Sequence, residues 1–182
     1  MIKKGNLLIA EPTDISDKNF NRSVILLVNH NESGSMGFIL NKKTEYSTKK
    51  LLPSLNFKFP IYSGGPVQQD SLYFIHNKPE LIPNSLKVKN EIYWGGDFKK
   101  VINLINNKKI KPGEIKFFLG YSGWHKNQLE NEIKLSSWII KKENENDKLL
   151  FEHCKNIWKD NLTELGGNYI IWSNSPDNPT HN

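Results

Sequence analysis

Cysteine is almost absent from this sequence, since Cys154 is the only one among 182 residues. A single cysteine excludes an intramolecular disulfide and any Cys-x-x-Cys redox or zinc motif. Such usage is typical of a reducing compartment, so we expect a cytoplasmic protein. Cys154 lies in "FEHCKNIW" beside apolar residues, where we expect a packing role; a reactive thiolate is the alternative.

Long hydrophobic runs are also missing. The longest, such as "VILLV" at 24–28, fall far short of the roughly 20 residues that cross a bilayer. The apolar run before Glu11 is too short for the core of a signal peptide. We therefore expect no membrane association.

Arginine is the third deficit, because only Arg22 among the 25 Lys and Arg residues is an arginine. The net charge of +6 favours contact with nucleic acid. Specific reading of phosphates and guanine edges, however, relies on the bidentate guanidinium. A/T-rich codons alone would raise the content of Lys, Asn and Ile. A protein partner is therefore the stronger candidate and nucleic acid the weaker one.

What is present suffices for one folded core. Hydrophobic residues make up 37% and aromatic residues 11% of the chain. A chain of this length buries about two-thirds of its unfolded surface, which supports one good core and leaves little material for a second. We predict a single domain over residues 1–174 and a polar, proline-punctuated tail over 175–182.

Apolar runs between turn residues predict strands first and helices later, which is an α+β pattern. Residues 24–30 and 36–41 flank "NESG" and predict a β-hairpin. Their apolar residues are nearly continuous, which favours burial on both faces. Further strands are expected at 71–76 and 115–124, and "NYIIWS" at 168–173 is expected as a closing strand.

Helices are predicted where the apolar spacing changes to three and four residues. Asp97 is placed to cap a helix over 98–105. The stretch 126–140 carries a second helix. A third runs over 156–165, with Gly166 at the position of a left-handed cap.

Five stretches carry a family resemblance: "GNLLIAEP" (5–12), "NFNRSVILLVNHNESGSMGFILN" (19–41), "SGGPVQQDSLYFIH" (63–76), "YWGGDF" (93–98) and "LGYSGWHKNQLENEI" (119–133). Trp138 and the segment 151–169 fit as well. Together they resemble the YqgE/AlgH family of small bacterial proteins, also called UPF0301 or DUF179. The resemblance implies one α+β domain, with a bifurcated, largely antiparallel sheet folded into a pseudo-barrel and helices packed outside.

The resemblance implies a link to transcriptional regulation and supplies no catalytic residues, metal ligands or cofactor. One departure from the family pattern follows the "ILN" strand. Lys42 and Lys43 stand there, where an arginine and a proline are expected.

Two kinds of side chain suggest chemistry. Ser122 in "GYSG" is similar to a nucleophile elbow, but Trp124 occupies the position that the elbow reserves for glycine, so a turn role is favoured. His30 and His76 each end a predicted strand. They would serve as a base or ligand pair if they met at one rim of the sheet; the ordinary interpretation is two polar rim residues.

Glycines recur where buried strands end, at Gly64 and Gly65 before Pro66, at Gly95 and Gly96, and at Gly123. These turns are either backbone corners, which we favour, or the border of one shared pocket. In the second case Trp124 and Gln128 would supply stacking and hydrogen bonds.

The leading hypothesis is a binding or regulatory module without a catalytic set. The alternative is a small-molecule enzyme or sensor that uses a glycine-lined pocket with His30 or His76.

Overall fold

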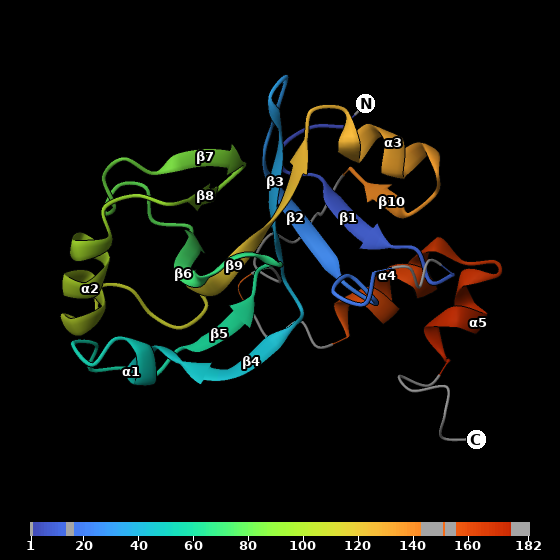
Figure 1. The fold of residues 1–182 in the computed structure, drawn as a ribbon. Coiled ribbons are helices and arrows are strands. Elements are labelled where there is room, and N and C mark those ends of the chain that lie inside the picture. Colours follow the sequence, from blue (N-terminus) through green and yellow to red (C-terminus); the bar gives the residue numbers. More distant parts are fainter. Residues whose placement is uncertain (1, 14–16, 143–150, 152–155, 176–182) are drawn as a thin grey trace.

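The computed structural model describes residues 2–13, 17–142, 151 and 156–175. Cys154 and the tail 176–182 lie outside the described residues, so the predictions made for them stay predictions, as does the domain boundary at residue 174. The described residues form a single α+β domain on one mostly antiparallel sheet (Figure 1), which confirms the predicted class. Among them, no helix has the length and apolar character needed to cross a bilayer.

Ten strands make up the sheet in the described part of the chain. They are β1 (Leu7–Ala10), β2 (Val24–Asn31), β3 (Gly34–Ile39), β4 (Lys43–Ser47), β5 (Pro60–Ser63), β6 (Val67–His76), β7 (Leu86–Lys89), β8 (Ile92–Trp94), β9 (Ile115–His125) and β10 (Trp138–Lys141). The main path runs β10-β1-β2-β3-β9-β6-β8-β7, and β4 and β5 branch from it. The predicted hairpin is confirmed as β2 and β3.

Strand β9 is the point at which the sheet divides. Its first half pairs in parallel with β5, from Phe117 to Leu119, and its second half pairs antiparallel with β3, from Ser122 to His125. Strand β6 pairs with the other edge. The expected bifurcation is therefore confirmed. The sheet is not closed into a barrel, because β10 and β7 stand at opposite ends of the pairing order, so the expected pseudo-barrel stays open.

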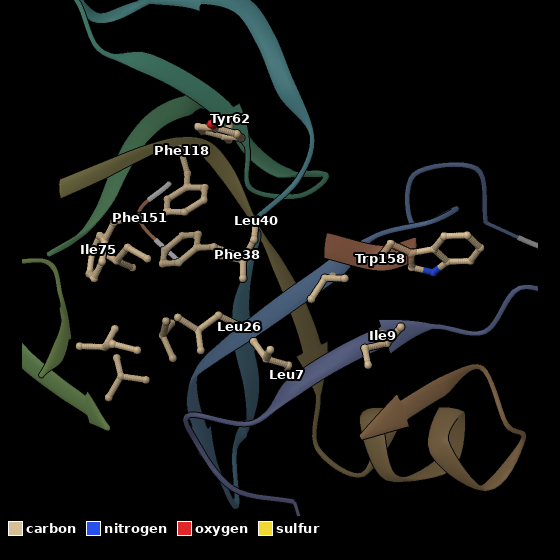
Figure 2. Close-up of a cluster of buried hydrophobic side chains, with 14 of the residues drawn as sticks. Leu7, Ile9, Leu26, Phe38, Leu40, Tyr62, Ile75, Phe118, Phe151 and Trp158 are labelled. Atoms are coloured by element: carbon tan, nitrogen blue, oxygen red, sulfur yellow. The ribbon is translucent and has the colours of Figure 1, made fainter. Parts of the chain in front are cut away.

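Three clusters of buried apolar side chains fill the two sides of the sheet. Alternate residues of β2 enter different clusters: Leu26 joins Phe38 and Phe118, whereas Ile25 and Leu27 face the opposite side. Figure 2 shows the first of these clusters, in which the rings of Phe38 and Phe118 stack with centroids 4.8 Å apart. Burial on both faces explains why the strand sequence is apolar nearly throughout.

Five helices lie around the sheet in the described residues: α1 (Thr48–Leu51), α2 (Phe98–Asn106), α3 (Gln128–Lys134), α4 (Ile157–Leu165) and α5 (Tyr169–Ser173). Figure 1 shows α1 and α2 at one end of the molecule and α3, α4 and α5 at the other. The predicted cap of α2 is confirmed, because Asp97 accepts a hydrogen bond from the Lys100 amide at 3.0 Å.

The prediction of a closing strand at 168–173 is wrong, since Tyr169–Ser173 forms helix α5. A strand needs a neighbouring edge, and this run follows two glycines with positive φ that turn the chain back after α4. The backbone amides of this run instead form local hydrogen bonds to carbonyls three residues earlier in the chain. The first of these joins the Tyr169 amide to the Gly166 carbonyl at 3.1 Å. Ile171 points to solvent, as a residue of a covered strand would not.

Candidate functional site

The two candidate histidines lie far apart along the sheet. His30 on β2 pairs with Ser35 on β3, which pairs with Trp124 near the end of β9. His76 on β6 instead pairs with Ile115 at the start of β9. Trp124 lies nine positions along β9 from Ile115, a span on the order of 25 Å. The structure does not bring these histidines into one site.

His76 has a structural role that its hydrogen bonds define. Its Nδ1 accepts from the Lys78 amide at 3.1 Å, so the ring proton sits on Nε2. That nitrogen lies 3.2 Å from the Gly95 carbonyl and 2.9 Å from Ser85 Oγ, which donates its own proton to the Ile82 carbonyl. Burial of the fully enclosed ring lowers the pKa of His76 to about 4, so the imidazole is neutral at pH 7.

His30 connects the β2–β3 hairpin to α3. Its Nδ1 lies 2.8 Å from Ser35 Oγ, and its Nε2 lies 3.7 Å from a carboxylate oxygen of Glu130. The half-buried ring thus bridges a strand and a helix as a polar rim residue.

The first glycine pair is a backbone corner. A Cβ on Gly64 would lie 2.2 Å from the Gly120 carbonyl oxygen, and a Cβ on Gly65 would lie 2.3 Å from the Tyr121 carbonyl carbon. Ser122 stabilises this contact. Its side chain is fully buried, and its Oγ donates a hydrogen bond to the Gly64 carbonyl at 3.0 Å. The hydroxyl that resembled a nucleophile is therefore engaged in holding two strands together.

The second pair lies in a different place. Gly95 accepts the His76 hydrogen bond, and Gly96 packs so closely that a Cβ there would lie 2.6 Å from Ile82. Pro66, after the first pair, is exposed. The glycine turns do not converge on one shared pocket, and Gly123 is the corner glycine that lies beside Trp124 and Gln128.

These last residues belong to a cavity that we call the indole pocket. It has a volume of about 200 Å³ and lies between the end of β9, helix α3, the start of β10 and the loop before β2. Its lining comprises Ala10, Asp17, Phe20, Gly123, Trp124, Gln128, Glu132, Ser137 and Trp138.

Three aromatic rings form its walls. Trp124 and Trp138 meet edge to face with centroids 6.0 Å apart. Phe20 stacks on Trp124 at 6.3 Å and meets Trp138 edge-on at 5.4 Å. Both indoles are nearly buried, because Leu129 and the surrounding strands pack behind them in the third core cluster.

Glu132 is held within the pocket by three side-chain donors. Its Oε2 accepts from the indole N–H groups of Trp124 and Trp138, both at 2.8 Å, and its Oε1 accepts from Gln128 Nε2 at 2.9 Å. The Gln128 carbonyl oxygen in turn accepts from the His125 amide at 3.0 Å. The side chains of Trp124, Trp138, Gln128 and Glu132 are therefore oriented before any ligand binds.

The described residues that line the pocket carry negative charge only. Asp17 is a second carboxylate among them, and they include no Lys, Arg or His side chain. Aromatic faces and an ordered carboxylate both attract cations, the first through the ring quadrupole and the second by direct charge. The arrangement suits an ammonium or guanidinium group.

Sequence reasoning placed Trp124, Gln128 and Gly123 near one another but missed Glu132 and Phe20. One signal for Glu132 was present, since it follows Gln128 by four residues and shares its helix face. No local pattern connects Phe20 to this site, because the contact depends on how the loop before β2 folds over the sheet. No group of three or more His, Cys, Asp or Glu side chains able to hold a metal occurs within the described ranges.

Fold and site together define a small single-domain α+β protein with a branched sheet and an aromatic, acidic pocket at one end. The AlgH-like family model, DUF179, matches residues 7–170. The chain belongs to this family, as its resemblance predicted.

Relatives match over essentially the whole chain. A UPF0301 protein of Cytophaga hutchinsonii is 40% identical over 184 residues and covers 100% of both chains. One of Parabacteroides distasonis is 42% identical, covering 97% of this chain and 89% of its own.

Two solved structures share the fold. The solution structure of AlgH from Pseudomonas aeruginosa has a TM-score of 0.73 at 26% identity, covering 96% of this chain and 95% of its own. Protein DIP2367 of Corynebacterium diphtheriae has a TM-score of 0.74 at 20% identity, covering 96% and 93%.

Proposed function

We propose that this protein is a binding module that recognises a partner protein by enclosing a cationic side chain in the indole pocket. The observation that carries the proposal is the Glu132 carboxylate, held by two indole N–H groups and an amide in a pocket where no basic residue is among the described lining residues. A lysine or arginine of the partner would supply the missing positive charge against the aromatic walls.

A protein partner accounts for this pocket better than nucleic acid does, because phosphates would be repelled by Asp17 and Glu132. A link to transcriptional regulation is compatible with such a module if it acts by contact with a regulatory protein. The single cysteine supports a cytoplasmic site of action.

The alternative of a small-molecule enzyme or sensor that uses a glycine-lined pocket with His30 or His76 has less support. General-base chemistry needs hydrogen-bond reach or one intervening water, and these two rings lie at opposite ends of β9. The low pKa of His76 and its saturated hydrogen bonds assign that ring to the fold.

The proposal is tested with amino-acid probes that differ in one charge. We expect the N-acetyl amides of lysine and arginine to shift the indole N–H signals of Trp124 and Trp138 saturably in NMR titrations. The N-acetyl amide of norleucine, which has the lysine stem without the ammonium group, should not shift them. Affinities on the order of 1 mM are expected for ligands of this size.

The matched variants are Glu132→Gln and Glu80→Gln. The first removes the pocket's charge but keeps the side-chain shape, so we expect about tenfold weaker binding of the cationic probes. The second removes an exposed charge outside the pocket and should leave binding unchanged. Equal shifts with the norleucine probe, or equal losses in both variants, would show that the pocket does not recognise a cation.

A further inference from the structure

A second cavity is lined in part by Asn21 and Arg22, which belong to the same loop that contributes Asp17 and Phe20 to the indole pocket. We call it the basic pocket. Its volume is about 480 Å³, and its lining comprises Asn21, Arg22, Asn41, Lys42, Asn156, Trp158, Lys159, Ser173, Asn174 and Ser175. Among the described residues, this lining has three cations, four carboxamides and two hydroxyls and includes no carboxylate side chain.

The arginine of this pocket is the only one in the sequence and is held in place. Its guanidinium lies 5.1 Å from the ring centroid of Trp158, which is itself anchored by a hydrogen bond of 2.8 Å to the Ala10 carbonyl. Arg22 Nη2 donates to the carbonyl and hydroxyl oxygens of Ser175 at 3.0 and 2.9 Å. The guanidinium plane is therefore oriented within the cavity wall.

Lys42 is the second cation. It is half-buried, and its Nζ donates to the Asn19 carbonyl at 2.6 Å. Burial lowers the pKa of Lys42, and the nearby Asp17 carboxylate only partly opposes this effect. A bound anion would offset the cost of desolvating the ammonium group.

Helix α4 begins at the same cavity. Asn156, Trp158 and Lys159 form its cap and first turn, and the Asn156 side chain makes no capping hydrogen bond among the described residues. The amides of a first turn and the helix dipole attract anions. Asp160 also lies in this turn, but it is exposed and is not part of the pocket lining.

We propose that the basic pocket binds the phosphate group of a small phosphate monoester. Three cations and a helix start converge on one cavity and suit a doubly charged oxyanion. The volume of about 480 Å³, against about 200 Å³ for the indole pocket, leaves room for an organic body beside the phosphate, and the carboxamides and hydroxyls supply polar contacts for it. This inference is independent of cation recognition at the indole pocket.

The test is calorimetric titration of the full chain at physiological ionic strength with inorganic phosphate, glucose 6-phosphate and adenosine monophosphate. We expect saturable binding of at least one monoester, tighter than that of inorganic phosphate. Differences between the sugar and nucleoside monoesters then identify the organic part. Succinate, a dicarboxylate, should bind at least tenfold more weakly than the best monoester.

Lysine variants assign the binding to this cavity. Lys42→Gln and Lys159→Gln should each weaken the best monoester about tenfold, because each removes a charged donor. Lys58→Gln removes an equal charge from an exposed position outside the cavity and should have no effect. Far-UV circular dichroism confirms that each variant is folded.

Three outcomes would overturn the proposal. They are the absence of saturable monoester binding by the folded chain, losses in Lys58→Gln as large as in the pocket variants, and succinate binding as tight as the monoesters. The first two refute the site, and the third refutes phosphate as its ligand class.

Discussion

Glu132 illustrates how much of a residue's role depends on its partners. In the sequence it is one of several acidic residues in a polar stretch. In the structure it accepts hydrogen bonds from two indoles and one amide that arrive from β9, β10 and its own helix. Ser122 and His76 show the converse, because side chains that suggest chemistry in the sequence are engaged in holding the fold together.

His76 leads to a prediction about stability and pH. Its pKa is about 4 in the folded protein and 6.5 in an unperturbed chain, because burial opposes the charged ring more than the Gly95 hydrogen bond and the Glu80 carboxylate favour it. Between these two values the unfolded state binds more protons than the folded state. Stability therefore falls as the pH is lowered from 6.5 to about 4, by about 3 kcal/mol.

Urea denaturation at a series of pH values, followed by tryptophan fluorescence, measures this loss. A His76→Gln variant is less stable at neutral pH but should lack this part of the pH dependence. Glu114, whose pKa is lowered by its hydrogen bonds to Lys111 and Lys78, contributes equally in both proteins, so the difference between them isolates His76. Parallel pH profiles would contradict the assignment.

Strand β9 shows what decides the arrangement at the scale of an element. It is long enough to pair with β5, β3 and β6, and its backbone kinks at Gly120, where φ is +68°. The glycine turn between β5 and β6 lies directly against this kink. Residues without side chains are needed there because two backbones approach closely.

Substitutions at two glycines separate close approach from backbone conformation. In Gly64→Ala the new methyl group would meet the Gly120 carbonyl at 2.2 Å, where neither backbone can move aside easily, so we expect a loss of about 3 kcal/mol or more. In Gly95→Ala nothing lies within 4 Å, and the positive φ of +68° alone should cost about 1 kcal/mol.

Urea midpoints of the two variants provide the comparison. Equal losses would mean that the corner at Gly64 is not sterically closed, which would reopen the pocket interpretation of this turn.

At the scale of the whole molecule, β9 connects the three core clusters. Phe117, Phe118 and Trp124 each belong to a different one. Since one strand contributes to all three, they should unfold together. A single loop contributes to both proposed sites, with Phe20 lining the acidic cavity and Arg22 the basic one.

Phe118→Ala tests this coupling. Removing a fully buried ring from the first cluster should destabilise the protein by about 3 to 5 kcal/mol. Thermal transitions recorded by far-UV circular dichroism and by the indole N–H NMR signals of Trp124 and Trp138, which report on the third cluster, should shift together. A transition of these indole signals separate from the circular dichroism transition would show that the clusters are independent units.

The sequence by itself determined the elements whose signals are local. Examples are the hairpin of β2 and β3, the Asp97 cap of α2 and the family membership that motifs such as "GYSGW" carry. Only the tertiary structure decided what depends on distant neighbours. An apolar run became α5 because the turn at Gly166 and Gly167 leads it into local hydrogen bonds, and two histidines at strand ends were separated by the length of β9. The same reason holds for both cavities, since their charges come from segments that only folding brings together.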